Sequence, residues 1–248
     1  MPRTARKKGE SGIYHVVLRG INQQLIFEDD EDNEMFLDVI EACKRVSGFE
    51  LYAYCLMSNH VHLLIRILAE DLDQIFKRIG ARYVFWFNWK YRRVGHLFQD
   101  RFRSEPVETD RYFLAVLRYI HKNPITAGIC GSIDGYKWSS FHEYVGDHRI
   151  VDRDFALEMT GSDGFVEFHQ SENEVDTFID DDVKRFRITD EYVKELMRKV
   201  CGVDTVDAFQ KFDKTQRAFY VGSLKDQGIT IRQISRLTGV SKGIVERA

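Results

Sequence analysis

Proline, cysteine and long apolar runs are all scarce in this chain of 248 residues, and each shortage excludes a class of protein. Three prolines and 17 glycines argue against a long disordered tract. No run approaches the roughly 18 apolar residues of a transmembrane helix, and the basic segment 1–8 lacks the apolar stretch of a secretory signal. The four cysteines form no Cys-x-x-Cys pair, which favours reduced thiols over disulfides or a zinc ribbon. We therefore expect a cytoplasmic protein without a membrane span.

Charged residues of both signs are present, and their distribution along the chain is more informative than the net charge. The net charge of −3 by itself argues weakly against a nucleic-acid partner. Between residues 74 and 104, however, Asp100 is the only acid. The basic residues of this stretch are Lys77, Arg78, Arg82, Lys90, Arg92, Arg93, Arg101 and Arg103. Such a cluster predicts a phosphate-binding surface, and the alternative is a solvated helix face that binds nothing.

Hydrophobic periodicity predicts the element order β-α-β-β-α-β, followed by one more helix. We expect strands over 14–18, 50–57, 61–67 and 97–107. We expect one helix between the acidic loop 28–32 and Gly48, one over 71–89, and one from the N-cap Thr109 to Asn123-Pro124. This order is that of the split β-α-β, ferredoxin-like α+β fold, in which the first and third strands lie in the middle of the sheet.

The character of the sequence changes near residue 145, which predicts three regions. Residues 1–145 hold the strands and helices just described, 146–188 form an acidic, irregular connector, and 189–248 form a helical domain. In the last segment Thr230 can cap a helix, Gly239 can make a turn and Ser241 can cap a second helix. This spacing is typical of a helix-turn-helix, and the alternative is a helical hairpin that packs on the body.

The segment Asn59-His60-Val61-His62 carries the strongest local signal for chemistry. Alternate side chains of a strand share a face, so His60 and His62 point the same way from a rigid central strand. Two imidazoles on one face make half of a metal site, and we expect them to be exposed and to contribute little to packing. The alternative is a chance pair of structural histidines.

A second signal lies in the predicted helix that ends at Pro124. Tyr119 and Asn123 are four residues apart, so a helix places them on one face. His121 points elsewhere and is not predicted to be a ligand. The alternatives are an amphipathic tyrosine at the boundary of helix and sheet, and an asparagine that only ends the helix before proline.

In combination and in order, these motifs resemble the HUH single-tyrosine transposases, and among them the REP-associated tyrosine transposases. The resemblance covers roughly residues 12–145, and its further matching segments are Tyr14-His15-Val16, 57–62, 95–103 and 119–128. The resemblance implies that His60 and His62 bind a divalent ion, Mg²⁺ or Mn²⁺, and that Tyr119 is the nucleophile. Asn123 matches the position of a further ligand, where many relatives outside this branch have glutamine.

The resemblance also implies a reaction and a partner. Tyr119 would attack a phosphate of single-stranded DNA with hairpin structure, leaving a 5′-phosphotyrosine and a free 3′-OH that can rejoin strands without ATP. A phenol with a pKa near about 10 is a poor nucleophile at neutral pH, so a divalent ion that polarises the phosphate would help. The residues expected to bind the DNA backbone are Arg101 and Arg103 on one face of the fourth strand, together with Lys77, Arg78, Arg82, Arg92 and Arg93.

Three other functions stay open from the sequence. A zinc hydrolase would use the two histidines and a water, without a covalent intermediate. A non-catalytic nucleic-acid-binding module of ferredoxin-like fold would bind without cutting. A rolling-circle replication initiator would share the tyrosine chemistry, but the segments 95–103 and 119–124 favour a transposase. The sequence also leaves open whether the protein is a monomer or a homodimer.

Overall fold

The computed structural model describes residues 8–99, 101–171, 178, 190–226, 229 and 231–247. The chain divides into two compact units, residues 1–182 and 183–248, each with its own apolar core. Across the described ranges, no helix is both long and apolar enough to cross a membrane. The first unit contains β1 (Ile13–Arg19), η1 (Ile21–Gln23), α1 (Asp30–Ser47), β2 (Glu50–Met57), β3 (His60–Arg66), α2 (Leu72–Lys90), β4 (Arg103–Pro106), α3 (Asp110–Thr126), η2 (Ile133–Gly135), α4 (Phe141–Val145), α5 (Asp154–Thr160) and α6 (Phe165–Gln170).

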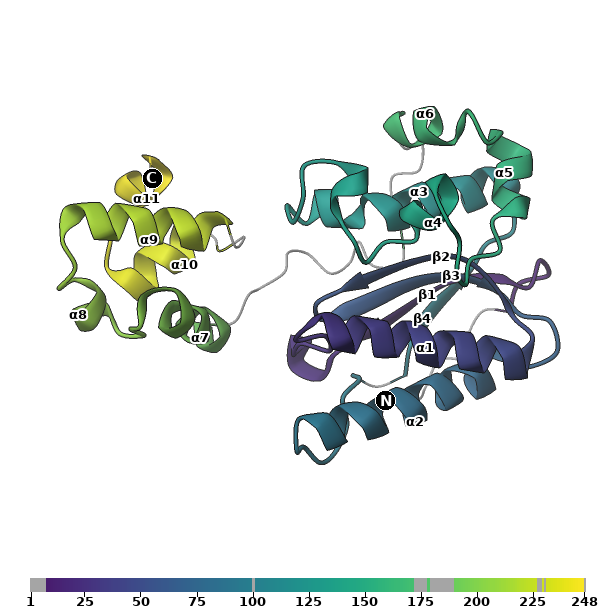
Figure 1. The fold of residues 1–248 in the computed structure, drawn as a ribbon, viewed down its shortest axis with the longest axis horizontal. Helices are drawn as coiled ribbons and strands as arrows, with labels where there is room; N and C mark the ends of the chain where they lie inside the picture. The colour runs from purple at the N-terminus through teal and green to yellow at the C-terminus, as the bar shows by residue number, and fades with distance from the viewer. Residues whose placement is uncertain are drawn as a thin grey trace. The chain divides into compact units, whose positions relative to one another are not determined.

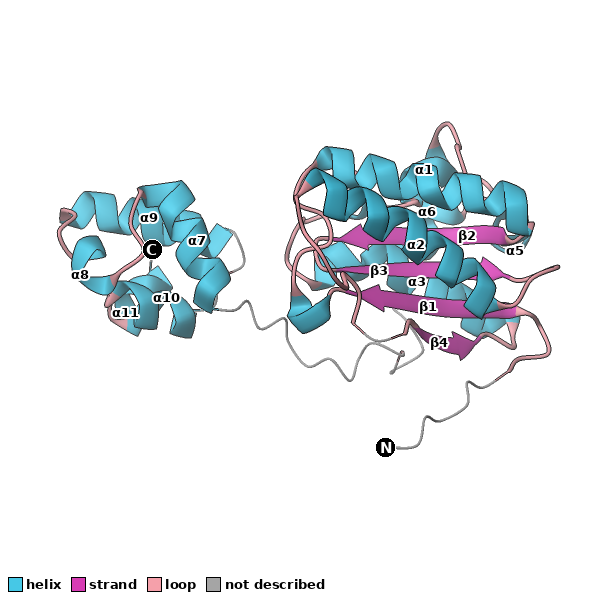
Figure 2. Cartoon of the chain, turned by 90° about the horizontal axis from the view of Figure 1, so that it is seen from below, coloured by secondary structure: helices cyan, strands magenta, loops and turns pink. Residues whose placement is uncertain are grey.

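A four-stranded antiparallel sheet forms the centre of the first unit (Figure 2). Its order is β2-β3-β1-β4, so the first and third strands lie in the middle, as predicted. In the pairing of β1 with β3, Val17 lies opposite His62 and Arg19 opposite His60. On the other side of β1, Glu105 of β4 lies opposite His15. The register therefore gathers polar residues of three strands in one part of an otherwise apolar sheet.

Both faces of the sheet are covered, which explains why its middle strands are buried along almost their whole length. Helices α1 and α2 cover one face and α3 covers the other (Figure 1). Helix α1 begins at the Asp29 cap, whose side chain accepts a hydrogen bond from the backbone N–H of Asp32. It ends at Gly48, whose φ of 68° is the left-handed conformation that glycine adopts readily after a helix. The acidic residues 30–32 thus belong to the first turn of α1 and not to a preceding loop, a favourable place for negative charge.

The fourth strand is shorter than the sequence predicts. Instead of 97–107, β4 covers only Arg103–Pro106. The backbone carbonyl of Leu97 accepts a hydrogen bond from Ile21, beyond the end of β1, and the Phe102 ring packs on Phe76 of α2 with 4.4 Å between centroids. Phe98 forms an isolated bridge with Gly20 there, so the pairing predicted from residue 97 onward is interrupted before β4 begins at Arg103. The prediction that Arg101 and Arg103 share one face of a strand is therefore wrong, because Arg101 lies outside β4.

Helix α3 continues past the predicted stop. Thr109 caps it as predicted, since its side chain accepts a hydrogen bond from the backbone N–H of Tyr112. The helix runs to Thr126 with Pro124 inside it. A proline removes one backbone donor from a helix, but the carbonyl of Asn123 still accepts a hydrogen bond from Ala127. Asn123 therefore lies within the helix and does not end it.

The first half of the predicted irregular connector is partly helical. Helices α5 and α6 lie there, and Ile150, Ala156 and Phe165 are buried in the core of the first unit. The Glu143 carboxylate of α4 accepts hydrogen bonds from the backbone N–H groups of residues 149, 150 and 151. The prediction of irregular structure is wrong over these two helices. Each helix is too short, and has too few apolar residues, for a helical period to be visible in the sequence. Most of the second half, 172–188, lies outside the described residues.

The second unit is helical, as predicted. Its elements are α7 (Asp190–Cys201), α8 (Val206–Phe209), α9 (Lys214–Asp226), α10 (Ile231–Thr238) and α11 (Lys242–Arg247). Val193, Phe209 and Ile234 lie in its core. Gly239, with a φ of 71°, separates α10 from α11, where the sequence places a turn. The predicted cap Thr230 lies outside the described residues.

Candidate active site

The structure brings His60, His62 and Tyr119 together, as the sequence predicts. The rings of the two histidines project from the same face of β3, with 4.9 Å between their centroids. The Tyr119 ring comes from α3 and meets the His62 ring edge-on at a centroid distance of 5.7 Å. The rigid central strand and the covering helix therefore position two imidazoles beside one phenol.

The two histidines are buried, contrary to the expectation that they are exposed. His60 is 7% exposed and His62 0%, because α3 covers this face of the sheet. Burial, which disfavours the imidazolium ion, and the nearby charge of Arg19 together lower the pKa of His60 to about 3. Burial also lowers the pKa of His62 well below its ordinary value. Both rings are neutral at neutral pH, which is the form that binds metal ions.

Hydrogen bonds orient both rings through the same nitrogen. Nδ1 of His60 lies 2.7 Å from the side-chain amide oxygen of Asn59, which can only accept, so this nitrogen donates. Nδ1 of His62 lies 3.1 Å from Nε2 of His15. The other nitrogen of His15, Nδ1, lies 2.9 Å from Oε1 of Glu105. A neutral His60 that donates from Nδ1 carries its lone pair on Nε2.

Asn123 lies one helical turn beyond Tyr119 in α3 and is half-buried. Among the residues that the structure describes, no group of three or more His, Cys, Asp or Glu side chains is placed to hold a metal ion. The role of Asn123 as a metal ligand stays a prediction.

Comparison with known proteins shows what this region resembles. Residues 9–123 match the family described as Transposase IS200 like. This part of the chain is similar to the IS200-like transposases. A Haemophilus influenzae protein named as a REP-associated tyrosine transposase is 26% identical over 148 residues, which cover 55% of this chain and 83% of that protein. The family predicted from the sequence is thereby confirmed.

A solved structure supports the fold. The structure of a REP-associated tyrosine transposase bound to a REP hairpin has a TM-score of 0.55 against this chain, with 17% sequence identity. The match covers 76% of this chain and 100% of that one.

Four residues of the first unit near the site were not predicted as functional. His15 contacts both Glu105 and His62, as described above. Arg19 lies opposite His60, and its charge lowers the pKa of both histidines. The Phe178 ring stacks on Tyr119, with 4.1 Å between centroids and 17° between the planes. His15 had a signal in the sequence, a histidine inside a strand of apolar residues, whereas Phe178 is too far along the chain to be placed by a local pattern.

His121 is part of a separate buried cluster, and its exclusion as a metal ligand stays a prediction. Its Nδ1 lies 2.8 Å from Nε2 of His169, and its Nε2 lies 2.7 Å from Oγ of Ser140. These contacts join α3 to α6 and to the residue before α4. These contacts hold helices together within the first unit.

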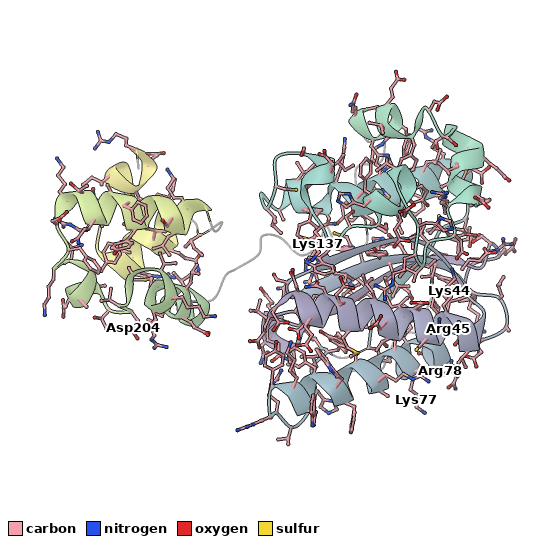
Figure 3. The ribbon with its side chains drawn as sticks, viewed as in Figure 1. Lys44, Arg45, Lys77, Arg78, Lys137 and Asp204 are labelled. Atoms are coloured by element: carbon pink, nitrogen blue, oxygen red, sulfur yellow. The ribbon has the colours of Figure 1, made fainter. Side chains whose placement is uncertain are left out.

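The basic residues predicted to bind DNA on α2 lie on the face of the sheet opposite Tyr119. Lys77 projects from the exposed side of this helix (Figure 3), whereas Arg78 donates a hydrogen bond to Ser47 at the end of α1. Arg78 is held by an ion pair with Glu70, 2.5 Å from Nη1 to Oε2, and Arg93 donates a hydrogen bond of 2.9 Å to Gln24. The exposed members of the set on and directly after this helix are Lys77, Arg82 and Arg92.

Exposed aromatic side chains lie among these basic residues. Phe85 is 77% exposed and Trp89 is 73% exposed, whereas Phe87 is buried in the core. Residues three and four apart in a helix share a face, so Arg82, Phe85 and Trp89 form one stripe along α2. Basic and aromatic side chains together on a solvent-exposed face are suited to contact a nucleic acid.

Proposed function

We propose that the protein cuts and rejoins single-stranded DNA, with Tyr119 as the nucleophile and with a divalent metal ion held by His60 and His62. The observation that carries this proposal is the placement of two neutral, hydrogen-bonded imidazoles beside the tyrosine of an IS200-like transposase domain. We also assign the β1-to-α3 region to the ferredoxin-like class. The sheet order β2-β3-β1-β4 supports this assignment.

The donors of the site suit Mg²⁺ or Mn²⁺. Nε2 of His60, Nε2 of His62 and the amide oxygen of Asn123 would hold the ion, a mixed nitrogen and oxygen set. Ligand histidines commonly donate their other ring N–H to a neighbouring acceptor, and the Nδ1 contacts of both histidines have this form. When bound, the ion would polarise the scissile phosphate and neutralise the charge that develops on it.

The chain's own residues would perform the covalent step. The phenol oxygen of Tyr119 attacks phosphorus and its proton is lost to solvent. The bond from phosphorus to the 3′ oxygen breaks, and that oxygen takes up a proton to become a 3′-OH. The strand downstream stays joined to Tyr119 through its 5′ phosphate. Arg19, close to His60 and His62, would attract the phosphate. A 3′-OH of another strand can reverse the step, because the tyrosyl ester conserves the bond energy.

The stripe on α2 would bind DNA away from the cleaved bond, since it lies on the opposite face of the sheet. Arg82 and Arg92 would neutralise phosphates, and Phe85 and Trp89 would stack on unpaired bases. A hairpin offers both paired and unpaired nucleotides. The structural relative is itself bound to a REP hairpin, which supports a DNA partner of this kind.

The second unit would contribute further DNA contacts. Residues 183–248 contain 14 Lys and Arg against 8 Asp and Glu, although the whole chain has a net charge of −3. Helices α10 and α11 around Gly239 have the order of a helix-turn-helix, in which α11 would be the recognition helix. Deletion of residues 189–248 should then weaken DNA binding or change target choice while the tyrosine chemistry persists. Unchanged affinity and site selection would instead favour a structural role for this unit.

The decisive experiment is a search for a covalent adduct. Labelled single-stranded oligonucleotides with a hairpin are incubated with the full chain and Mn²⁺, and protein and DNA are separated under denaturing conditions. The wild type should carry the 5′ end of the downstream strand, and Tyr119→Phe should carry none. Tyr112→Phe, an equal change in the same helix, is the matched control and should still form the adduct. Loss of one hydroxyl should change the free energy of unfolding by about 1 kcal/mol at most.

The same experiment separates the alternatives. Metal-dependent cleavage without an adduct would indicate a hydrolase that uses water. Binding without cleavage would indicate a non-catalytic module. An adduct that persists in Tyr119→Phe, or one that maps to the 3′ end, would overturn the assignment of the nucleophile.

A further inference from the structure

His15 lies between an acid and a predicted metal ligand because of the strand register. β1 is the strand between β3 and β4, and His15 is opposite Glu105 on one side. On the other side His15 is opposite Leu64, two residues from His62, so that His15 and His62 are diagonal neighbours on one face. Their rings are nearly parallel, at 23°, with 5.3 Å between centroids. His15 is fully buried.

The three side chains form a continuous line of hydrogen bonds. Oε1 of Glu105 lies 2.9 Å from Nδ1 of His15, and Nε2 of His15 lies 3.1 Å from Nδ1 of His62. A carboxylate can only accept, so Nδ1 of His15 carries the hydrogen of the first contact. A neutral imidazole has a single N–H, so Nε2 of His15 then accepts from Nδ1–H of His62. The lone pair of His62 is thereby assigned to Nε2.

This assignment matters for metal binding, because a histidine binds an ion only through a nitrogen that carries a lone pair. A neutral histidine side chain in water prefers to carry its hydrogen on Nε2, which is the nitrogen that His62 must offer. A partner that accepts from Nδ1 reverses this preference. Both ring nitrogens of His15 are engaged, one with Glu105 and the other with His62. His15 therefore supports a metal ligand and is not a ligand itself.

We propose that Glu105 and His15 are positioning residues, which hold His62 in the Nδ1–H form and direct its Nε2 toward the metal ion. The inference rests on the proposed function where it concerns the metal ion. The position of the hydrogen on the His62 ring in the metal-free protein does not depend on the proposed function. Asn59 performs the same task for His60 through one contact between neighbours in the chain. His62 instead depends on two residues from two other strands.

The first test measures the affinity of the full, metal-free chain for Mn²⁺ by calorimetry. His15→Phe keeps the ring shape and removes both nitrogens, and it should weaken binding about 10- to 100-fold, as changes behind metal ligands typically do. His15→Gln offers an amide oxygen to His62 and should restore part of the affinity. Glu105→Gln keeps an acceptor for His15 and should weaken binding less than Glu105→Ala.

A matched control separates positioning from stability. His169→Phe makes the same change at another buried histidine, in the separate cluster with His121. It should lower the melting temperature without changing the Mn²⁺ affinity. Equal Mn²⁺ affinity of folded His15→Phe and wild type would overturn the proposal.

The second test needs no metal and reads the ring directly. Nitrogen-15 NMR of the histidine side chains should show His62 with hydrogen on Nδ1 in the wild type and a shift toward Nε2–H in His15→Phe. The proposal would be contradicted if wild-type His62 carried its hydrogen on Nε2. It would also be contradicted if the hydrogen of His62 stayed on Nδ1 in His15→Phe. A wild type with the expected ring that binds no Mn²⁺ would instead overturn the proposed metal site and leave the positioning contacts standing.

Discussion

Two groups of buried histidines contact opposite sides of helix α3, and they differ in what their ring nitrogens contact. Tyr119 faces one group and His121, two positions later, belongs to the other. In both groups burial lowers the pKa of histidines, among them His62 and His121. Burial and a lowered pKa therefore do not identify a metal site by themselves.

The hydrogen bonds separate the two groups. In the cluster of His121 and His169, all four ring nitrogens contact protein atoms: the two rings contact each other, His121 contacts Ser140, and Nδ1 of His169 lies 2.8 Å from the carbonyl of Phe165. In the site, the contacts of His60 and His62 with Asn59 and His15 go through Nδ1 and assign the lone pair to Nε2. The first arrangement is suited to joining helices, and the second to binding an ion.

The largest expected difference between the groups is in metal affinity. His62→Ala should weaken Mn²⁺ binding by more than about 100-fold, beyond the usual effect of changes behind a ligand. His121→Ala should leave the affinity unchanged. Calorimetry on both variants measures this contrast, and equal losses would mean that the two groups do not differ as proposed.

Both of these variants should be destabilised, which corrects the expectation that the ligand histidines contribute little to packing. Each change leaves buried polar partners without their hydrogen bond, a loss of roughly 1–3 kcal/mol in the free energy of unfolding. Urea unfolding at pH 7 provides the control, since affinities are meaningful only for folded variants.

The second expected effect is a pH dependence of stability from the His121 cluster. Burial lowers the pKa of His169 from 6.5 to about 4. As the pH falls below 6.5, the unfolded chain binds a proton at this position and the folded chain does not until about pH 4, so stability declines across this window. The contribution of this one residue is on the order of 3 kcal/mol.

His169→Gln should make the decline less steep, since a glutamine does not titrate. The measurement is urea unfolding between pH 7 and 4.5 for wild type and variant. Other buried histidines contribute in both proteins, so the difference between the two slopes is the quantity of interest. Identical slopes would show that His169 does not contribute.

The smallest expected effect concerns Asn123. Asn123→Ala should weaken Mn²⁺ binding less than His60→Ala, because a neutral amide oxygen is a weaker ligand than imidazole. We expect the Mn²⁺ affinity to fall about 10-fold, which is at the lower end for changes around a metal site. Calorimetry measures this loss. An unchanged Mn²⁺ affinity would mean that Asn123 has only a structural role in α3.

Much of the first unit could be predicted because its signals are local. The strand Glu50–Met57 has the predicted bounds, and the cap at Thr109 and the end at Gly48 follow from single residue types. The errors occur where distant contacts prevail over a local pattern. Phe102 packs on α2 and shortens β4, and α3 continues through Pro124 although proline usually ends a helix.

The sequence by itself determined that His60 and His62 share a face and that Tyr119 lies on a helix, because strand and helix periods are fixed by backbone geometry. Only the tertiary structure decided that both histidines are buried and that His62 rests on His15, 47 residues away, which in turn meets Glu105 at a separation of 90. The physical reason is register. The pairing of three strands places these side chains, and no pattern within a single strand specifies which residue of another strand lies beside it.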